Sequence, residues 1–263
     1  MDLNQELRQM FEDMKKSTED SVKVLHEARI QRALHDIVHL ELKAAQLVDS
    51  GIQKKKACQY AGAKDDFFEA QYIYYELLDE QIPELYEIMK ERSDPLLAKD
   101  LEEYRKQKQT CAEGRIQGIK FIGDVFSLEG NTTKAKQNYL LAIEVFRATE
   151  DPSLFSKYLV GLMYWLCRDK ANTKSVQEFG EIAARYFEEC VQLGKGAQGV
   201  MDKKAFQFSC EALGHFHQGD VPGLRNDEKS YHYFCIATDS GYDCSDQLVK
   251  YKKNLFGKIK YIG

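Results

Sequence analysis

Histidine is the residue type that most directly suggests metal chemistry in this sequence. His35 and His39 are four positions apart, so on a helix they share one face at a spacing that can hold a metal ion, and His26 lies two to three turns earlier. No cysteine or carboxylate stands where it would complete the ligand set, because Asp36 points elsewhere on the helix and Glu41 is offset. The pattern favours surface or interface histidines over a metal site, and we expect no cofactor.

Other polar side chains follow patterns that helix formation explains without catalysis. Asp65, Asp66 and Glu69 gather in the first turn of an expected helix, where the helix dipole favours negative charge. His215 and His217 lie beside a glycine turn and are interpreted as groove or packing residues. The sequence has no glycine-rich phosphate loop after a strand, and no serine or cysteine in a nucleophile motif. We therefore expect a protein that is not an enzyme.

Seven cysteines are spread along the chain without a CxxC pair. Most of them fall among apolar helix positions, which predicts small buried thiols. An odd number without framework spacing favours a reducing compartment over disulfides or structural zinc. The seven are Cys58, Cys111, Cys167, Cys190, Cys210, Cys235 and Cys244.

The composition indicates an all-α protein. The 263 residues include only four prolines, and Leu, Ala, Glu, Lys and Gln are abundant while β-branched alternation is scarce. No apolar run approaches the roughly 18 to 20 residues of a membrane helix, and the first 16 residues form an amphipathic pattern without a signal-peptide core. We expect a cytoplasmic protein without stable membrane insertion. A net charge of −5 argues against a nucleic-acid partner.

A pattern of small and large residues recurs three times at a period of nearly fifty residues. The last copy contains Ser230, Phe234, Ala237 and Gly241 at helical steps, and earlier copies stand 47 and a further 48 positions upstream. The equivalent residues are Ala183, Phe187, Cys190 and Gly194 in the middle copy, and Ala135, Tyr139 and Ala142 in the first. A small residue lets a neighbouring helix approach closely, and the aromatic ring fills the wedge beyond it. Three copies therefore predict stacked helix pairs.

The first copy resembles the tetratricopeptide repeat. Five residues stand at that family's spacing, namely Gly123, Phe126, Ala135, Tyr139 and Ala142, with Gly130 at the turn. The last copy is similar to the Sel-like variety of the repeat, in which a longer loop joins the helices. Its matching residues are Leu213, Gly214, Lys229, Ser230, Tyr233, Phe234, Ala237 and Gly241.

Two of the copies depart from these patterns. In the last copy the turn glycine, Gly219, comes one residue early, and His217 occupies the usual aromatic slot. The middle copy has Val160, Gly161 and Tyr164, followed by the residues from Ala183 to Gly194, and its loop, RDKANTKSVQEFG, is enlarged. The resemblance covers residues 115 to 245 and implies a right-handed α-solenoid.

The resemblance also implies a binding groove. In tetratricopeptide-like proteins the first helices line a concave face, and the residues three before, one after and four after the small glycine position project into it. These positions are Lys120, Asp124 and Ser127 in the first copy, Tyr158, Leu162 and Trp165 in the second, and Glu211, His215 and Gln218 in the third. Aromatic anchors with a polar rim suit a protein or peptide site. The alternative is that Tyr158 and Trp165 are buried in the core.

Together these features predict a non-catalytic protein that recognises a protein or peptide and acts as an adaptor or scaffold. Apolar burial in the groove would supply affinity and the charged rim selectivity. Two alternatives stay open: a dedicated inhibitor or immunity-type protein that neutralises one enzyme or toxin, and a peptide-sensing regulator. The sequence assigns no oligomeric state.

The rest of the chain is predicted to flank this array. Residues 1–93 are expected to form an N-terminal helical bundle. Its first helix extends to residue 16. Ser17 and Asp20 cap a second, long helix, which ends at Gly51. A degenerate repeat at Ala70, Tyr74 and Leu77 belongs to it. Residues 94–263 form the repeat array, begun by a helix with Asp94 and Pro95 at its cap and first turn. A final amphipathic helix in the lysine-rich tail caps the array or, alternatively, contacts an acidic partner or membrane surface.

Overall fold

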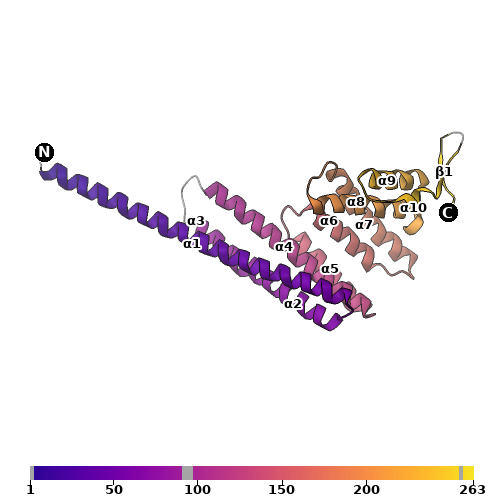
Figure 1. Cartoon of the computed structure of the whole chain (residues 1–263), viewed down its shortest axis with the longest axis horizontal. Coiled ribbons are helices and arrows are strands. Elements are labelled where there is room, and N and C mark those ends of the chain that lie inside the picture. Colours follow the sequence, from indigo (N-terminus) through magenta and orange to yellow (C-terminus); the bar gives the residue numbers. More distant parts are fainter. Residues whose placement is uncertain (1–2, 91–96, 255–256) are drawn as a thin grey trace.

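The computed structural model of the chain is helical almost throughout (Figure 1) and describes residues 3–90, 97–254 and 257–263. The α-helices are α1 (Leu3–Lys56), α2 (Tyr60–Glu76), α3 (Ile82–Lys90), α4 (Leu97–Leu128), α5 (Thr132–Arg147), α6 (Leu154–Cys167), α7 (Thr173–Leu193), α8 (Val200–His215), α9 (Asp227–Asp239) and α10 (Ser245–Leu248). Two π-helical turns, η1 (Leu77–Gln81) and η2 (Phe216–Asp220), and two strands, β1 (Tyr251–Lys253) and β2 (Ile259–Tyr261), complete the described elements. The all-α prediction is confirmed for the described part of the chain.

A glycine on the first helix and an aromatic ring on the second bring each repeat pair together. Between α4 and α5, a β-carbon added at Gly123 would lie 2.6 Å from the ring of Tyr139. The equivalent contacts are Gly161 with Phe187 at 2.7 Å between α6 and α7, and Gly214 with Phe234 at 2.6 Å between α8 and α9. A real β-carbon does not approach a ring this closely, so glycine permits the close packing. The predicted small/large pattern thus packs the helices in all three pairs.

The C-terminal part of α1 and α2 form a fourth pair with the same contact. A β-carbon at Gly51 would lie 2.6 Å from the ring of Phe67, and these residues are separated by the same interval as Gly123 and Tyr139. The buried residues Ala63 and Ala70 flank Phe67 as Ala135 and Ala142 flank Tyr139. The prediction that Gly51 ends a helix is wrong, because the residue lies inside α1. The degenerate repeat predicted on Ala70, Tyr74 and Leu77 is displaced by seven residues, about two helical turns, from the equivalent residues Ala63, Phe67 and Ala70.

Helix α4 joins the N-terminal helices to the repeats. Cys111, Ile122 and Val125 are buried with α1, α2 and α3, whereas Ile116 and Ile119 are buried with α5 and the helices beyond it. The boundary predicted near residue 93, and the cap predicted at Asp94 and Pro95, lie outside the described residues. Because α4 shares a core with both neighbours, packing is continuous from α1 to α9.

The predicted break between two N-terminal helices is wrong, since α1 runs without interruption from Leu3 to Lys56. The hydroxyl groups of Thr18 and Ser21 donate to the carbonyls of Met14 and Ser17 at 2.9 and 2.8 Å, inside the helix. Serine and threonine side chains can bond to the preceding turn in this way and need not begin a new helix.

The loop predicted to be enlarged between α6 and α7 is also shorter than expected. Helix α7 begins at Thr173 because the side chain of Asn172 accepts hydrogen bonds from the backbone N–H groups of Lys174 and Ser175. Most of the segment RDKANTKSVQEFG is therefore helical.

The predicted C-terminal capping helix is wrong as well. After the short α10, β1 and β2 pair antiparallel, with Tyr251 opposite Tyr261 and Gly257 in the turn at φ 80°. In β2, Ile259 and Tyr261 alternate with Lys258 and Lys260, a two-residue period that suits a strand. Tyr251 is buried, and its hydroxyl lies 2.5 Å from that of Ser230 on α9, so the hairpin covers the last repeat.

The cysteines are all free thiols. Five are buried, as predicted for most of them, whereas Cys235 is half-buried and Cys58 is exposed at a positive φ of 59° in the α1–α2 turn. Among the described helices, none combines the length and apolar character needed to cross a membrane.

Candidate functional site

An aromatic pocket of about 390 Å³ lies between α6, α7 and α8. Five of the residues predicted for the groove line it, namely Tyr158, Leu162, Trp165, Glu211 and His215. The remaining lining residues are Phe187, Phe208, Ala212, Phe216 and Asp220. Tyr158, Leu162 and Trp165 recur at every fourth or third position of α6, so one face of that helix forms one wall. The structure thus brings together residues that lie more than fifty positions apart in the sequence.

Tyr158 and Trp165 line the aromatic pocket and also pack at the edge of the core. Each is half-buried and packs against the buried cluster. The Tyr158 ring lies 5.8 Å from that of Phe187 and 5.7 Å from that of Phe208, and the Trp165 ring lies 4.6 Å from that of Phe216. Neighbouring rings fix their rotamers, so the pocket is preformed. A preformed apolar surface binds a partner without a large ordering cost.

The rim of the aromatic pocket is acidic. Glu211 and Asp220 are both lining residues, and His215 stands between them with its ring against Phe234. Burial raises the pKa of Tyr158 to about 12, with the Glu211 charge as a further cause. Burial and a hydrogen bond with Glu211 raise the pKa of Tyr242 to about 12. A carboxylate at the edge of an aromatic surface favours a ligand with an apolar body and a positive charge.

The π-helical turn η2 helps to shape this pocket and was not predicted. Phe216 and Asp220 both belong to η2, which directly continues α8. Gly219 lies inside η2 at a non-helical φ of 140°, and His217 is held by a hydrogen bond of 2.6 Å between its Nδ1 and the carbonyl of Leu224. The early position of Gly219 and the histidine in the aromatic slot were the sequence signals of this irregularity. π-Helical turns occur often at functional sites.

Trp165 also lines a second pocket, of about 720 Å³, which we call the basic pocket. Lys136, Arg168 and Lys170 line it, together with a single carboxylate, Asp169, whose Oδ1 already accepts from the backbone N–H of Ala171 at 3.0 Å. Ser127, another residue predicted for the groove, lies here. The two pockets that share Trp165 therefore differ in charge, since the aromatic pocket has an acidic rim and the second pocket is mainly basic.

The other predicted groove residues lie apart from both pockets. Lys120 and Asp124 form a partly buried ion pair on α4 with 2.8 Å between Nζ and Oδ2, and Lys120 is only 8% exposed. Lys55 at the end of α1 approaches the same oxygen at 3.3 Å, and the Tyr139 hydroxyl donates to the other oxygen at 3.0 Å. These contacts make the pair a structural link between α1, α4 and α5. Gln218 belongs to η2 but does not line the aromatic pocket.

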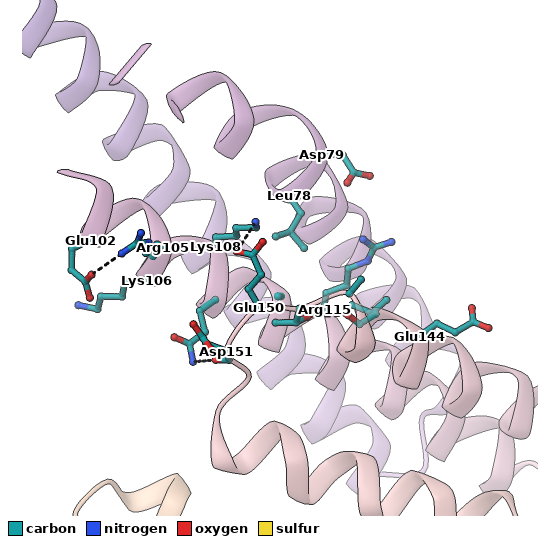
Figure 2. A pocket seen from close by; sticks show the side chains of 15 residues that line it. Leu78, Asp79, Glu102, Arg105, Lys106, Lys108, Arg115, Glu144, Glu150 and Asp151 are labelled. Atoms are coloured by element: carbon teal, nitrogen blue, oxygen red, sulfur yellow. Dashed lines mark hydrogen bonds and ion pairs between the residues drawn. The ribbon is translucent and has the colours of Figure 1, made fainter. Parts of the chain in front are cut away.

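A third pocket, of about 700 Å³, lies where α4 meets η1 and the end of α5 (Figure 2). Figure 2 shows acidic and basic side chains interleaved around it, and some of these charges form ion pairs. Lys108 pairs with Glu150 at 3.4 Å, and Arg105 lies 3.9 Å from Glu102. Gln109 donates to the carbonyl of Asp151 at 3.1 Å. None of the residues predicted for the groove lines this pocket.

The histidines considered for a metal site do not form one in the described structure. His35 lies 3.5 Å from Asp36, and both side chains are well exposed. No group of three or more histidine, cysteine or acidic side chains that could hold a metal ion occurs among the described residues.

No known protein-family model matches the sequence, and no curated protein is significantly similar to it.

Proposed function

We propose that this chain is a non-catalytic recognition module that binds a protein or peptide segment in the groove formed by α6, α7 and α8. The observation that carries the proposal is the convergence of Tyr158, Leu162, Trp165, Glu211 and His215 on one preformed aromatic pocket. Aromatic anchors surrounded by polar residues are the usual composition of an energetically important contact centre.

The fold supports this proposal by analogy with repeat proteins. The glycine–aromatic contacts recur in four helix pairs, which is the packing expected of a right-handed solenoid of tetratricopeptide-like and Sel-like repeats. In such an arrangement the first helix of each pair, here α6 and α8, lines the concave surface.

The charges around the groove define the segment that it would select. Glu211 and Asp220 favour a basic residue beside the apolar side chain that enters the aromatic pocket. Lys136, Arg168 and Lys170 face the other side of Trp165 and favour an acidic residue there. The preferred ligand is thus a short extended segment with an apolar anchor between a basic and an acidic residue.

A displayed library of random dodecapeptides tests this function, because selection from it requires no candidate partner. After selection on the whole protein, synthetic versions of the enriched peptides are titrated against the emission of Trp165, the only tryptophan in the chain. We expect saturable emission changes and a shared apolar residue with a basic neighbour. Leu162→Ser should weaken binding at least tenfold, because it removes an apolar wall of the pocket.

Leu141→Ser is the matched control, since Leu141 is 44% exposed on α5 and lines neither pocket of the groove. Circular dichroism verifies that both variants fold. Selection without a shared motif, or peptides that bind the Leu162→Ser variant as tightly as the original protein, would overturn the proposal.

A further inference from the structure

The C-terminal segment that contains β1 and β2 is strongly basic. Residues 250–263 include five lysines, no arginine and no acidic residue, in a chain whose net charge is −5. Figure 1 shows the two strands at the end of the molecule opposite the start of α1. The sign of the charge at this end is thus the reverse of that of the whole chain.

The register of the two strands places four of these lysines on one face. Lys252 lies directly opposite Lys260. Residues two positions apart along a strand share a face, so Lys250 and Lys258 belong to the same face. The backbone N–H of Ile262 donates to the carbonyl of Lys250 at 2.8 Å, which places Ile262 on this face too. We call these four lysines and Ile262 the lysine face.

The opposite face of the hairpin packs on α9. Tyr251 is buried, and its ring lies 6.3 Å from that of Phe234. Because the tyrosine side of the hairpin is held against the helix, the lysine face is directed towards solvent. The exposed lysines of this face are Lys252, Lys258 and Lys260.

The charges of the lysine face are not compensated within the described part of the chain. None of its four lysines forms an ion pair there, and Lys250 donates instead to the neutral amide of Gln247 at 3.1 Å. The carboxylate of Asp227 contacts the hairpin, but it accepts from the backbone N–H of Tyr261 at 3.0 Å. Like charges directly opposite on two strands destabilise the pairing. An anionic surface against the lysine face removes this repulsion.

The shape and composition of the lysine face favour an extended anionic surface over a single small anion. The hairpin lines none of the three pockets described above. Specific phosphate and carboxylate sites often use arginine, whose planar group bonds two oxygens at once, whereas lysine acts as a point charge. A row of lysines outside a pocket therefore suits many anions spread over a plane.

Among extended anionic partners, a lipid bilayer fits this face best. Lysine is depleted in protein–protein interfaces. Single-stranded nucleic acids stack their bases on aromatic rings, but Tyr251 and Tyr261 lie on the other face of the hairpin. Anionic lipids attract clusters of lysine without a pocket or a stacking surface. Ile262, which is 51% exposed, adds an apolar side chain that can lie between headgroups.

The net charge of −5 does not oppose this contact. At physiological ionic strength, charges separated by more than about 8 Å are largely screened from each other. The lysines nearest the lipid then determine the attraction, and the acidic remainder of the chain favours an orientation in which the hairpin approaches first.

We propose that the lysine face of the C-terminal hairpin docks this protein peripherally on anionic lipid bilayers. The strands lie at the level of the headgroups, and the lysine side chains contact the lipid phosphates and carboxylates. This inference is independent of the groove between α6, α7 and α8 and of its ligand.

Co-sedimentation with vesicles tests the docking. The full-length protein is mixed with sucrose-loaded vesicles of phosphatidylcholine that contain about one third phosphatidylserine, or with vesicles of phosphatidylcholine alone. We expect binding to the anionic vesicles only, and weaker binding as salt is added. Each lysine at a lipid surface contributes about a fivefold change in affinity, so Lys252→Glu/Lys260→Glu should weaken binding at least tenfold.

Two further variants separate the lysine face from net charge and from folding. Lys203→Glu/Lys204→Glu makes the same change in net charge at exposed positions of α8 and should leave vesicle binding nearly unchanged. Lys252→Glu alone places a glutamate opposite Lys260, which favours the strand pairing. This variant should keep its thermal stability and still lose at least about fivefold in vesicle binding.

Three results would contradict the docking. One is equal binding to neutral and anionic vesicles, and another is a loss of binding that is the same for the α8 control and for Lys252→Glu/Lys260→Glu. The third is failure to bind anionic vesicles together with binding of a double-stranded oligonucleotide or of poly-glutamate, which would assign the lysine face to a nucleic acid or to an acidic protein.

Discussion

The guanidinium carbon of Arg168 lies 3.5 Å from the centroid of the Trp165 ring. Arg168 follows the last residue of α6, and its guanidinium also donates to the carbonyl of Trp165. Burial lowers the pKa of this arginine, and the Asp220 charge partly offsets the effect. The cation covers one face of the indole where the aromatic and basic pockets adjoin, so it holds the side chain that both pockets share.

Removal of this cation should loosen the indole. We expect Arg168→Ala to shift the Trp165 emission to longer wavelength, to increase its quenching by acrylamide, and to cost about 1 kcal/mol of folding free energy. Arg168→Lys keeps the charge but loses the planar stacking, so it should give an intermediate result. Unchanged emission and quenching in the alanine variant would contradict the observed geometry.

The glycine–aromatic contacts should show a position-specific response to a single methyl group. At Gly123 the added β-carbon meets the Tyr139 ring at 2.6 Å, so we expect Gly123→Ala to lower the free energy of unfolding by about 2 kcal/mol. Gly118 lies on the same helix and has no atom within 4 Å of such a carbon. Gly118→Ala should therefore gain up to about 1 kcal/mol from helix propensity. Urea denaturation measures both, and equal stability of the two variants would refute the close packing.

The repeat packing of α4 to α9 could be predicted because it depends on local spacing. Gly161 and Gly214 contact the predicted aromatic rings even though the connections between their helices differ in length. The same signal was present and missed at Gly51 and Phe67. A glycine after a serine suggested a helix end, whereas the glycine is needed for close contact between two helices.

Whether a predicted groove residue is buried or exposed depends on contacts with other helices, which the sequence spacing does not reveal. Lys120 stands at a groove position of its repeat, yet it is buried because Lys55, from the end of α1, lies across the same carboxylate. The C-terminal hairpin shows the same limit, since Tyr251 of β1 is held in place by Ser230 and Phe234 of α9, which are distant in the sequence. In so short a segment, the residue spacing of an amphipathic helix and the alternation of a strand are hard to distinguish.

The partly buried carboxylate of Asp124 should be important for stability rather than for binding. Asp124→Asn leaves Lys55 and Lys120 facing each other without an anion, so we expect a loss of about 3 kcal/mol in the free energy of unfolding. The control is Glu69→Gln at the exposed Lys43–Glu69 pair, 2.9 Å between charged atoms, which should cost less than about 1 kcal/mol. Similar losses in the two variants would show that the Asp124 cluster is not a structural link.

Alkaline pH should destabilise the fold through Tyr158. Its pKa is raised to about 12 by burial, against about 10 for a tyrosine in an unfolded chain. Between these values the unfolded state has released the phenol proton while the folded state retains it. The unfolded state then binds fewer protons, so the free energy of unfolding falls as pH rises, by up to about 1.4 kcal/mol per pH unit for this group. The contribution is fully present below pH 10 and is lost by about pH 12.

Tyr158→Phe removes this dependence, since phenylalanine has no proton to release. We expect the stability of the variant relative to the original protein to rise steadily between about pH 10 and 12, as measured by urea denaturation at several pH values. Tyr72→Phe, at a side chain that is 68% exposed, is the matched control and should leave the pH profile unchanged. Parallel profiles for the original protein and Tyr158→Phe would mean that the phenol ionises freely in the folded state. The wall of the aromatic pocket would then be open to water, and the preformed surface on which peptide recognition depends would not exist.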